Sequence, residues 1–190
     1  MGPLRVAVIE TPRLTLTLPG PSAAPEVLDY YERNRRHLAP WEPQRAEGFY
    51  EVAYWRKRLA ADREEFRKGR SMRLFLMSKE DARVVGNAHF TEIVRGPFLA
   101  CHLGYGLDSR LEGQGFMSEA LRAAIGYAFD ELGLHRIMAS YRPTNERSGS
   151  LLRRLGFVVE GYARDYLLID GRWRDHVLTS LLRPEPRCPR

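Results

Sequence analysis

A short glycine-containing segment near the middle of this 190-residue chain has the composition of an anion-binding loop. It reads RLEGQG over residues 110–115, between a strand-like stretch ending near Leu107 and a helical pattern beginning near Gln114. The first amides of a helix lack partners within the helix and lie at the positive end of its dipole, so they bind phosphate oxygens. Gly113 and Gly115 present no side chain that would keep a phosphate away, and Arg110 adds a positive charge. We therefore predict a phosphate site here; a tight turn without a ligand is the alternative.

The loop differs from the two commonest phosphate motifs. A P-loop has Lys and then Ser or Thr after its last glycine, whereas Phe116 and Met117 follow Gly115. A dinucleotide-binding fingerprint has three glycines within a parallel βαβ unit, whereas this loop has two and follows strands that look antiparallel. Both classes of nucleotide site are disfavoured.

Hydrophobic periodicity predicts the elements that hold the loop. Strands are expected over residues 14–18, 72–77, 84–94, 98–107, 135–141, 157–169 and 173–182. Helices are expected over residues 26–38, 48–68, 117–132 and 145–155. A strand, helix, strand succession around the loop implies a right-handed crossover and a parallel pair, whereas short turns join most other strands. The fold class is mixed α/β, with a mostly antiparallel sheet.

Composition places the chain among ordinary globular proteins, since 44% of residues are hydrophobic and 28% are charged. We expect one domain over residues 1–183 and a tail over 184–190. Apolar runs long enough to span a bilayer and a secretory signal pattern are both missing from the sequence, so no membrane association and a cytoplasmic location are expected. Only Cys101 and Cys188 are present, which disfavours a disulfide framework.

The formal net charge of +6 and the pI near 9.6 would suit a partner rich in phosphate. The positive charge is almost entirely arginine, however, so a coding bias explains the imbalance equally well. His89, His102, His135 and His176 lie in strand patterns without the spacing of metal ligands, and no metal is predicted.

The RLEGQG segment resembles the R/Q-x-x-G-x-G/A loop of the GCN5-related N-acetyltransferases (GNAT), and the order of elements is similar across nearly the whole chain. The resemblance implies acetyl-CoA as cosubstrate, bound where two parallel strands splay apart. Backbone groups of Tyr105, Gly106 and Leu107 would pair with its pantetheine arm. The pyrophosphate would be held by Arg110, Leu111, Glu112, Gly113, Gln114, Gly115, Phe116 and Met117.

Four further segments are similar to the RimJ-type ribosomal-protein-alanine N-acetyltransferases. These are LAPWEP at residues 38–43, NERSG at 145–149, LGF at 155–157 and EGYARDYLLIDGRWRDH at 160–176. The resemblance implies that the acceptor is the N-terminal α-amine of a protein, with alanine on a small-subunit ribosomal protein as the expected case. Ribosome association is compatible with this, and the oligomeric state is left open between monomer and homodimer.

The acceptor side contains one candidate for a general base. Two prolines leave Trp41 and Glu42 on a stiff loop that we expect to border the acceptor groove, where Tyr141 and Tyr166 could also lie. Glu42 is the first candidate to take the proton of the amine, directly or through a water. The alternatives are that Glu42 only pairs with a neighbouring cation or contacts the charge of the acceptor, and that the tyrosines are core aromatics.

The cosubstrate side needs hydrogen-bond donors for the oxyanion and for the departing thiolate. A backbone N–H near Tyr105 would serve the oxyanion. Many members of the superfamily have a tyrosine seven residues after the helix-capping asparagine, but Leu152 stands there. Ser148 matches a serine of related ribosomal-protein acetyltransferases and could donate to the sulfur; a solvated serine is the alternative. Asn145 could cap the helix and hold a pantetheine amide.

Two other functions remain open at this stage. The same fold could acetylate a small-molecule amine, such as an antibiotic, a polyamine or an amino acid. The arginines that flank Glu42, at positions 33, 35, 36 and 45, disfavour a polycationic acceptor. The chain could instead be a ribosome-associated assembly factor in which an acetyl-CoA site is secondary.

Overall fold

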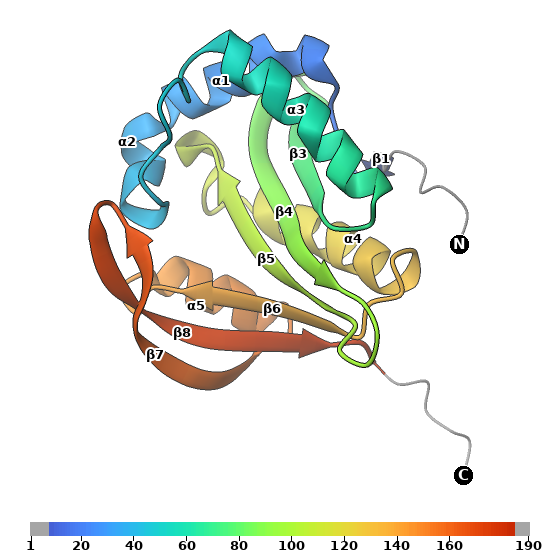
Figure 1. The fold of residues 1–190 in the computed structure, drawn as a ribbon, viewed down its shortest axis with the longest axis vertical. Helices are drawn as coiled ribbons and strands as arrows, with labels where there is room; N and C mark the ends of the chain where they lie inside the picture. Colours follow the sequence, from blue (N-terminus) through green and yellow to red (C-terminus); the bar gives the residue numbers. More distant parts are fainter. Residues whose placement is uncertain (1–7, 185–190) are drawn as a thin grey trace.

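An eight-stranded sheet forms the centre of the protein (Figure 1). The computed structural model describes residues 8–184. The strands are β1 (Val8–Glu10), β2 (Leu14–Thr17), β3 (Met72–Ser78), β4 (Val84–Val94), β5 (Ala100–Leu107), β6 (Arg136–Tyr141), β7 (Val158–Ile169) and β8 (Arg172–Leu182). Their spatial order is β1-β2-β3-β4-β5-β6-β8-β7, and only the β5–β6 pair is parallel. The predicted mixed α/β class is confirmed.

Five helices cover the two faces of the sheet (Figure 1). They are α1 (Ala24–Arg33), α2 (Arg35–Leu38), α3 (Val52–Arg67), α4 (Phe116–Asp130) and α5 (Glu146–Arg154). Short 3₁₀ turns lie at Pro21–Ala23, Ala39–Trp41 and Ser109–Leu111. Within residues 8–184, every helix is too short or too polar to span a membrane.

Two features differ from the sequence expectation. The helix predicted over 26–38 is broken at Asn34, whose side-chain amide donates to the carbonyl of Tyr30 and to Asp108. A side chain that bonds to the backbone competes with continued helix, which explains the break. The strand β1 was not predicted, because three residues are too few for a periodic pattern. Most of the predicted tail, with Cys188, lies outside the described residues.

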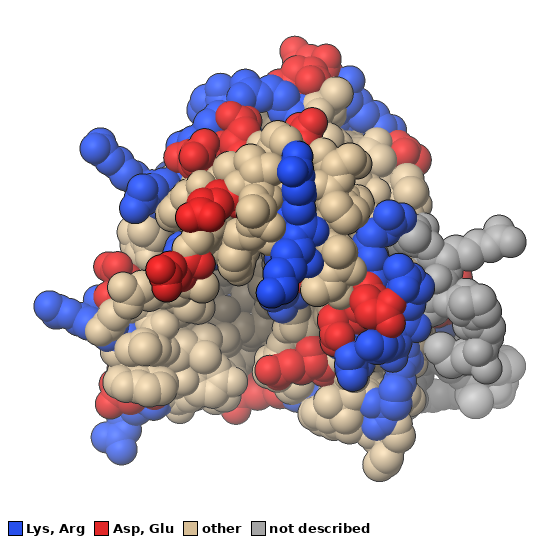
Figure 2. Space-filling model, turned by 45° about the horizontal axis from the view of Figure 1, so that its top comes forward, with Lys and Arg blue, Asp and Glu red and all other residues tan. Residues whose placement is uncertain are grey.

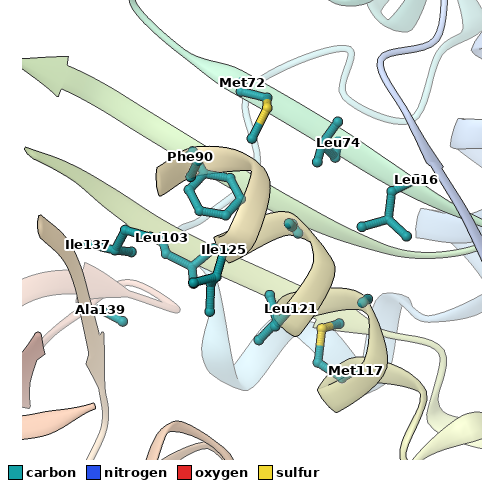
Figure 3. Close-up of a cluster of buried hydrophobic side chains, with 14 of the residues drawn as sticks. Leu16, Met72, Leu74, Phe90, Leu103, Met117, Leu121, Ile125, Ile137 and Ala139 are labelled. Atoms are coloured by element: carbon teal, nitrogen blue, oxygen red, sulfur yellow. The ribbon is translucent and has the colours of Figure 1, made fainter. Parts of the chain in front are cut away.

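The larger hydrophobic core lies between α4 and one face of the sheet (Figure 3). Met117, Leu121 and Ile125 recur at helical spacing and point from α4 toward strand side chains such as Phe90 and Leu103. Burial of each such side chain contributes about 1.5–3 kcal/mol relative to exposure. This packing fixes the first turn of α4 relative to the end of β5.

A second, aromatic cluster lies on the opposite face, where α1 and α3 pack. The ring of Tyr31 stacks on Trp55 with a centroid separation of 4.8 Å, and Phe49 contacts both rings edge-on. The cluster anchors the segment between α1 and α3, which includes Trp41 and Glu42.

Strands β5 and β6 are paired over three residues only. The pairs are Ala100 with Arg136, Cys101 with Ile137 and His102 with Met138, after which the strands diverge (Figure 1). The rest of β5, through Leu107, is paired with β4 but not with β6. An open wedge of unpaired backbone therefore crosses the middle of the sheet.

The β7–β8 hairpin ends the sheet, with β7 at its edge. Its predicted Asp170-Gly171 turn is confirmed, since both residues have positive φ (48° and 71°), as a type I′ turn requires. Two irregularities interrupt the β7–β8 register, one between Val159 and Gly161 and one between Ala163 and Leu167.

Candidate active site

The backbone of β5 presents hydrogen-bonding groups to the wedge. The N–H of Asp108 donates to the carbonyl of Val85 on β4 (2.8 Å), and the carbonyl of Gly106 lies against Gly86 on the same strand. Along a strand these groups alternate between the two sides, so those of Tyr105 and Leu107 point into the wedge. Of the three residues predicted to pair with a pantetheine arm, two thus face the gap. Gly106 contributes its lack of a side chain, because a Cβ there would lie 3.1 Å from the Tyr30 hydroxyl.

The predicted phosphate loop connects the end of β5 to α4. Gly113 and Gly115 both have positive φ (74° and 82°), and Gly115 is the residue that precedes the first turn of α4. A Cβ at Gly113 would meet no atom within 4 Å, so the loop is open on that side. Exposed glycines before unpartnered helix amides fit a pyrophosphate.

A buried carboxylate, Asp108, holds the start of this loop. It accepts hydrogen bonds from the backbone N–H and guanidinium of Arg110, and from Asn34 and Arg33 on the α1 side. Burial opposes ionisation, but these hydrogen bonds outweigh it and hold the pKa of Asp108 well below its usual range. Asn34 also accepts from the N–H of Ser109 (3.1 Å). The guanidinium of Arg110, predicted to meet the phosphates, is thus engaged by Asp108.

Arg13, at the start of β2, holds the other end of the loop. Its guanidinium donates to the carbonyl of Gln114 (2.9 Å) and lies 3.9 Å from the centroid of the Phe116 ring. Its backbone and side chain both donate to Glu119, in the first turn of α4. An acidic residue is favourable at this end of a helix.

Glu112, at the centre of the loop, contacts two other elements. Its carboxylate pairs with Arg147 on α5, and its other oxygen lies 3.5 Å from Nε2 of His37 on α2. The loop is therefore attached to the helices on both sides of the wedge.

Ser148 lies in the first turn of α5, next to the wedge. Asn145 caps this helix as predicted, since its side-chain oxygen accepts from the N–H of Ser148 (3.1 Å). The Ser148 hydroxyl lies 2.7 Å from the hydroxyl of Tyr105. Burial raises the pKa of Tyr105 to about 12, so its hydroxyl remains protonated near neutral pH.

Tyr141, at the end of β6, packs against the backbone of α5. A Cβ at Gly149 would lie 2.7 Å from the Tyr141 ring, so the close contact requires glycine. The ring also belongs to the larger hydrophobic core. Its observed contacts are those of a core aromatic.

Glu42 borders a cavity of about 550 Å³ between the α2–α3 segment and the hairpin tip. Its carboxylate forms an ion pair with Arg45, whose guanidinium lies over the ring of Phe49 (4.2 Å). Its carbonyl accepts from the N–H of Asp170 (3.3 Å), which also borders the cavity. Glu42 thus pairs with a neighbouring cation, which is one of the alternatives that the sequence left open, and its backbone joins the segment to the hairpin tip.

The other predicted acceptor-side aromatics lie at the surface. Trp41 is exposed and lies under the guanidinium of Arg142 (5.3 Å), which also donates to the carbonyl of Pro40. Tyr166 is exposed on β7, and its ring centroid is 5.6 Å from that of His176. Arg142 connects the α2–α3 segment to the end of β6, on the open side of the wedge.

Charges of both signs are interspersed on the face that Figure 2 shows, around a hollow bordered mainly by uncharged residues. Among residues 8–184, no three His, Cys, Asp or Glu side chains are grouped as a metal site. Cys101 is buried in β5, and burial raises the pKa of its thiol to about 12, which leaves it unreactive.

Several residues that shape the site were not found from the sequence. They are Arg13, Asn34, Asp108 and Arg147. Asp108 directly precedes the loop motif and could have been considered as a cap for the Ser109–Leu111 turn. Arg13 and Gln114 are 101 positions apart, so local spacing gives no sign of their contact.

Comparison with known proteins agrees with this geometry. Residues 13–158 match the acetyltransferase (GNAT) domain family. The chain is 46% identical over 177 residues to the [ribosomal protein uS5]-alanine N-acetyltransferase of Escherichia coli K12, covering 93% of this chain and 91% of that protein.

Two solved structures are also similar. Ribosomal-protein-S5-alanine acetyltransferase from Vibrio fischeri has a TM-score of 0.90 and 38% identity, over 94% of this chain and 98% of that one. Mycobacterium smegmatis RimJ in complex with CoA-disulfide has a TM-score of 0.85 and 29% identity, over 95% and 88% of the two chains. With a family match over most of its length, an open wedge in its sheet and a glycine loop before α4, the chain belongs to the GNAT acetyltransferase family.

Proposed function

We propose that this enzyme transfers the acetyl group of acetyl-CoA to the N-terminal α-amine of a ribosomal protein that begins with alanine. The small-subunit protein uS5 is the first acceptor to test, because it is named in the Escherichia coli relative. The observation that carries the proposal is the wedge between β5 and β6, with the glycine loop at its end. A ribosomal acceptor also makes the cytoplasm the expected location.

The unpaired backbone groups of Tyr105 and Leu107 would bind the pantetheine arm as a strand binds its neighbour. The amides at residues 113–117 would bind the pyrophosphate. The N–H of Tyr105 would also meet the oxyanion that develops on the thioester carbonyl, and the hydroxyl of Ser148 would donate to the departing sulfur. Asn145 has its amide N–H₂ group available for the pantetheine while its oxygen caps α5.

The reaction would proceed by direct attack in a ternary complex, since orientation of two bound reactants supplies much of the acceleration. We propose that Glu42 takes the proton of the amine, directly or through a water. Its carboxylate borders the cavity between the α2–α3 segment and the hairpin tip, from which an amine could approach. A free α-amine has a pKa of about 7.7–8.0, so a mild base is sufficient.

Thiol release in the presence of acetyl-CoA and synthetic peptides tests the acceptor. We expect turnover with a free N-terminal alanine, weaker turnover with serine or methionine, and none when the terminus is blocked. Free polyamines and amino acids are the comparison set. Binding of acetyl-CoA without turnover on any amine would contradict the proposal and favour an assembly role.

Substitution Glu42→Gln tests the base. We expect kcat to fall about a hundredfold near pH 7, which is the scale of general base catalysis. The deficit should shrink above about pH 8, where the α-amine loses its proton without help. A rate equal to that of the wild-type enzyme across this pH range would exclude Glu42 as the base.

A further inference from the structure

The first turn of α5 is restrained at Ser148 from three directions. Asn145 binds its backbone N–H, Tyr141 packs against the neighbouring Gly149, and Tyr105 reaches its hydroxyl from β5. A serine whose role was only to start a helix in solvent would need the first of these alone. The other two fix where the hydroxyl lies and how its hydrogen points.

We propose that Tyr105 is a positioning residue, whose hydroxyl donates to Ser148 and so directs the Ser148 hydrogen toward the sulfur of the thioester. This inference rests on the proposed function, because it concerns the same leaving group. Tyr105 itself does not contact the reacting atoms through its side chain.

Hydrogen-bond counting supports this direction of donation. A serine hydroxyl has one hydrogen and two lone pairs, and the only side chain within hydrogen-bond distance of it, among the described residues, is Tyr105 at 2.7 Å. If Ser148 donated to Tyr105, its single hydrogen would not be available for a hydrogen bond to the sulfur. If Tyr105 donates, the Ser148 hydrogen remains available on the side away from the tyrosine.

The environment of Tyr105 is compatible with the donor role. Its hydroxyl is held in the protonated form by burial, which raises its pKa to about 12, so it keeps a hydrogen to donate throughout the pH range in which the enzyme would work. Its own backbone N–H faces the wedge, so the residue that would support the oxyanion also orients the donor to the leaving group.

The chemical step balances without transfer of the tyrosine proton. The amine nitrogen forms a bond to the carbonyl carbon and loses its proton to Glu42 or water, while the C–S bond breaks and its electron pair goes to sulfur. Ser148 stabilises the developing negative charge with a hydrogen bond, and the thiolate is protonated afterwards from solvent. Because free thiols have a pKa of about 8.5, full proton transfer during bond breaking is not required.

Substitution Tyr105→Phe removes the hydroxyl and keeps the ring. We expect this variant to lower kcat about tenfold, and Ser148→Ala to lower kcat about a hundredfold, because a single donor to a developing charge contributes on this scale. The KM for acetyl-CoA should be unchanged in both variants. In the Ser148→Ala background, Tyr105→Phe should have no further effect, since its only route to the sulfur is gone. Tyr127→Phe, on α4 in the same core, is the matched control and should leave kcat unchanged.

Three outcomes would overturn the inference while leaving the proposed function intact. The first is a wild-type kcat in Tyr105→Phe, and the second is an equal loss of kcat from Tyr105→Phe with and without Ser148. The third is a loss that appears in the KM for acetyl-CoA, which would assign Tyr105 to binding. Failure of the wild-type enzyme to acetylate any peptide terminus would contradict the proposed function itself. This result is obtained with the unsubstituted protein, so it is distinct from the three outcomes above.

Discussion

At the scale of single residues, Asp108 has the largest structural role around the phosphate loop. Its side chain is 2% exposed and joins Arg33 at the end of α1 to Arg110 within the loop. Removing one member of a buried ionic group leaves the others without compensation, which is more costly than loss of an exposed pair. The position of the loop therefore depends on this carboxylate.

We expect Asp108→Asn to lower the free energy of unfolding by about 3 kcal/mol and to weaken acetyl-CoA binding. The pKa of Asp108 is lower in the folded than in the unfolded chain, so its ionised form stabilises the protein above the ordinary Asp value of about 4. That contribution is lost as the pH falls from there toward the folded-state pKa.

Urea unfolding of both proteins across pH provides the measurement. The difference in stability should be constant from about pH 5 to 8 and should shrink below about pH 4. Glu65→Gln, which removes an exposed partner of Arg70, is the control and should change stability little at any pH. A stability difference that grows on acidification would show that the ionised carboxylate of Asp108 does not stabilise the folded protein.

A substitution at Gly113 provides a test of the phosphate site. We expect Gly113→Val to abolish acetyl-CoA binding in calorimetry, because a branched side chain would occupy the space that the pyrophosphate needs next to the amides. The strain of a β-branched residue at positive φ is a separate effect. Gly69→Val controls for it, since Gly69 has φ 68°, open surroundings and no contact with the loop. Unchanged affinity in Gly113→Val would mean that the loop is not the phosphate site.

At the scale of elements, α4 and α5 contain glycines in opposite surroundings. A Cβ at Gly126 in α4 meets nothing within 4 Å, whereas one at Gly149 in α5 would lie 2.7 Å from the Tyr141 ring. Replacement of glycine by alanine should therefore stabilise the protein at one of these positions and destabilise it at the other.

We expect Gly126→Ala to stabilise the protein by about 0.5–1 kcal/mol, because alanine loses less backbone entropy in a helix. Gly149→Ala should destabilise it by about 1–3 kcal/mol, the usual cost of overpacking, and should lower kcat by displacing Ser148. Thermal unfolding and thiol release measure the two effects. Equal and small shifts in Tm would show that Tyr141 yields easily and does not restrain α5.

Elements with a long periodic pattern could be predicted from the sequence. The strand over 84–94 and the apolar face of α4 match the structure, because their patterns repeat many times. The break at Asn34 could not be predicted, since it depends on a hydrogen bond to Asp108, 74 positions away. The glycine loop could be placed from local chemistry, but its supports could not, because Arg13 and Asn34 come from distant segments.

At the scale of the whole molecule, the sheet consists of two parts joined by three residue pairs between β5 and β6 and by the α4 crossover. A ligand that fills the wedge would add a strand-like layer of hydrogen bonds between the parts. Binding to the folded state alone stabilises it by mass action.

We therefore expect acetyl-CoA at about a hundred times its Kd to stabilise the protein by about 2.7 kcal/mol. Amide hydrogen exchange should slow most at Tyr105, Leu107 and the end of β6 that is not paired with β5. Thermal scans of the wild type and of Gly113→Val at matched ligand concentration provide the comparison, and only the wild type should shift. Slowed exchange confined to the α1 and α3 face would place the ligand elsewhere.

The two irregularities in the β7–β8 register also affect how one molecule meets another. An edge strand with exposed apolar residues, such as Val158, Val159 and Leu168, could template pairing with a second chain and so promote aggregation. Here the irregularities divide β7 into short runs, and the charged side chains of Glu160, Arg164 and Asp165 lie at the breaks. A strand of another chain could pair with only two or three consecutive residues of β7 before the hydrogen-bonding register is interrupted. We therefore expect the shape of the hairpin to disfavour strand pairing between molecules along β7.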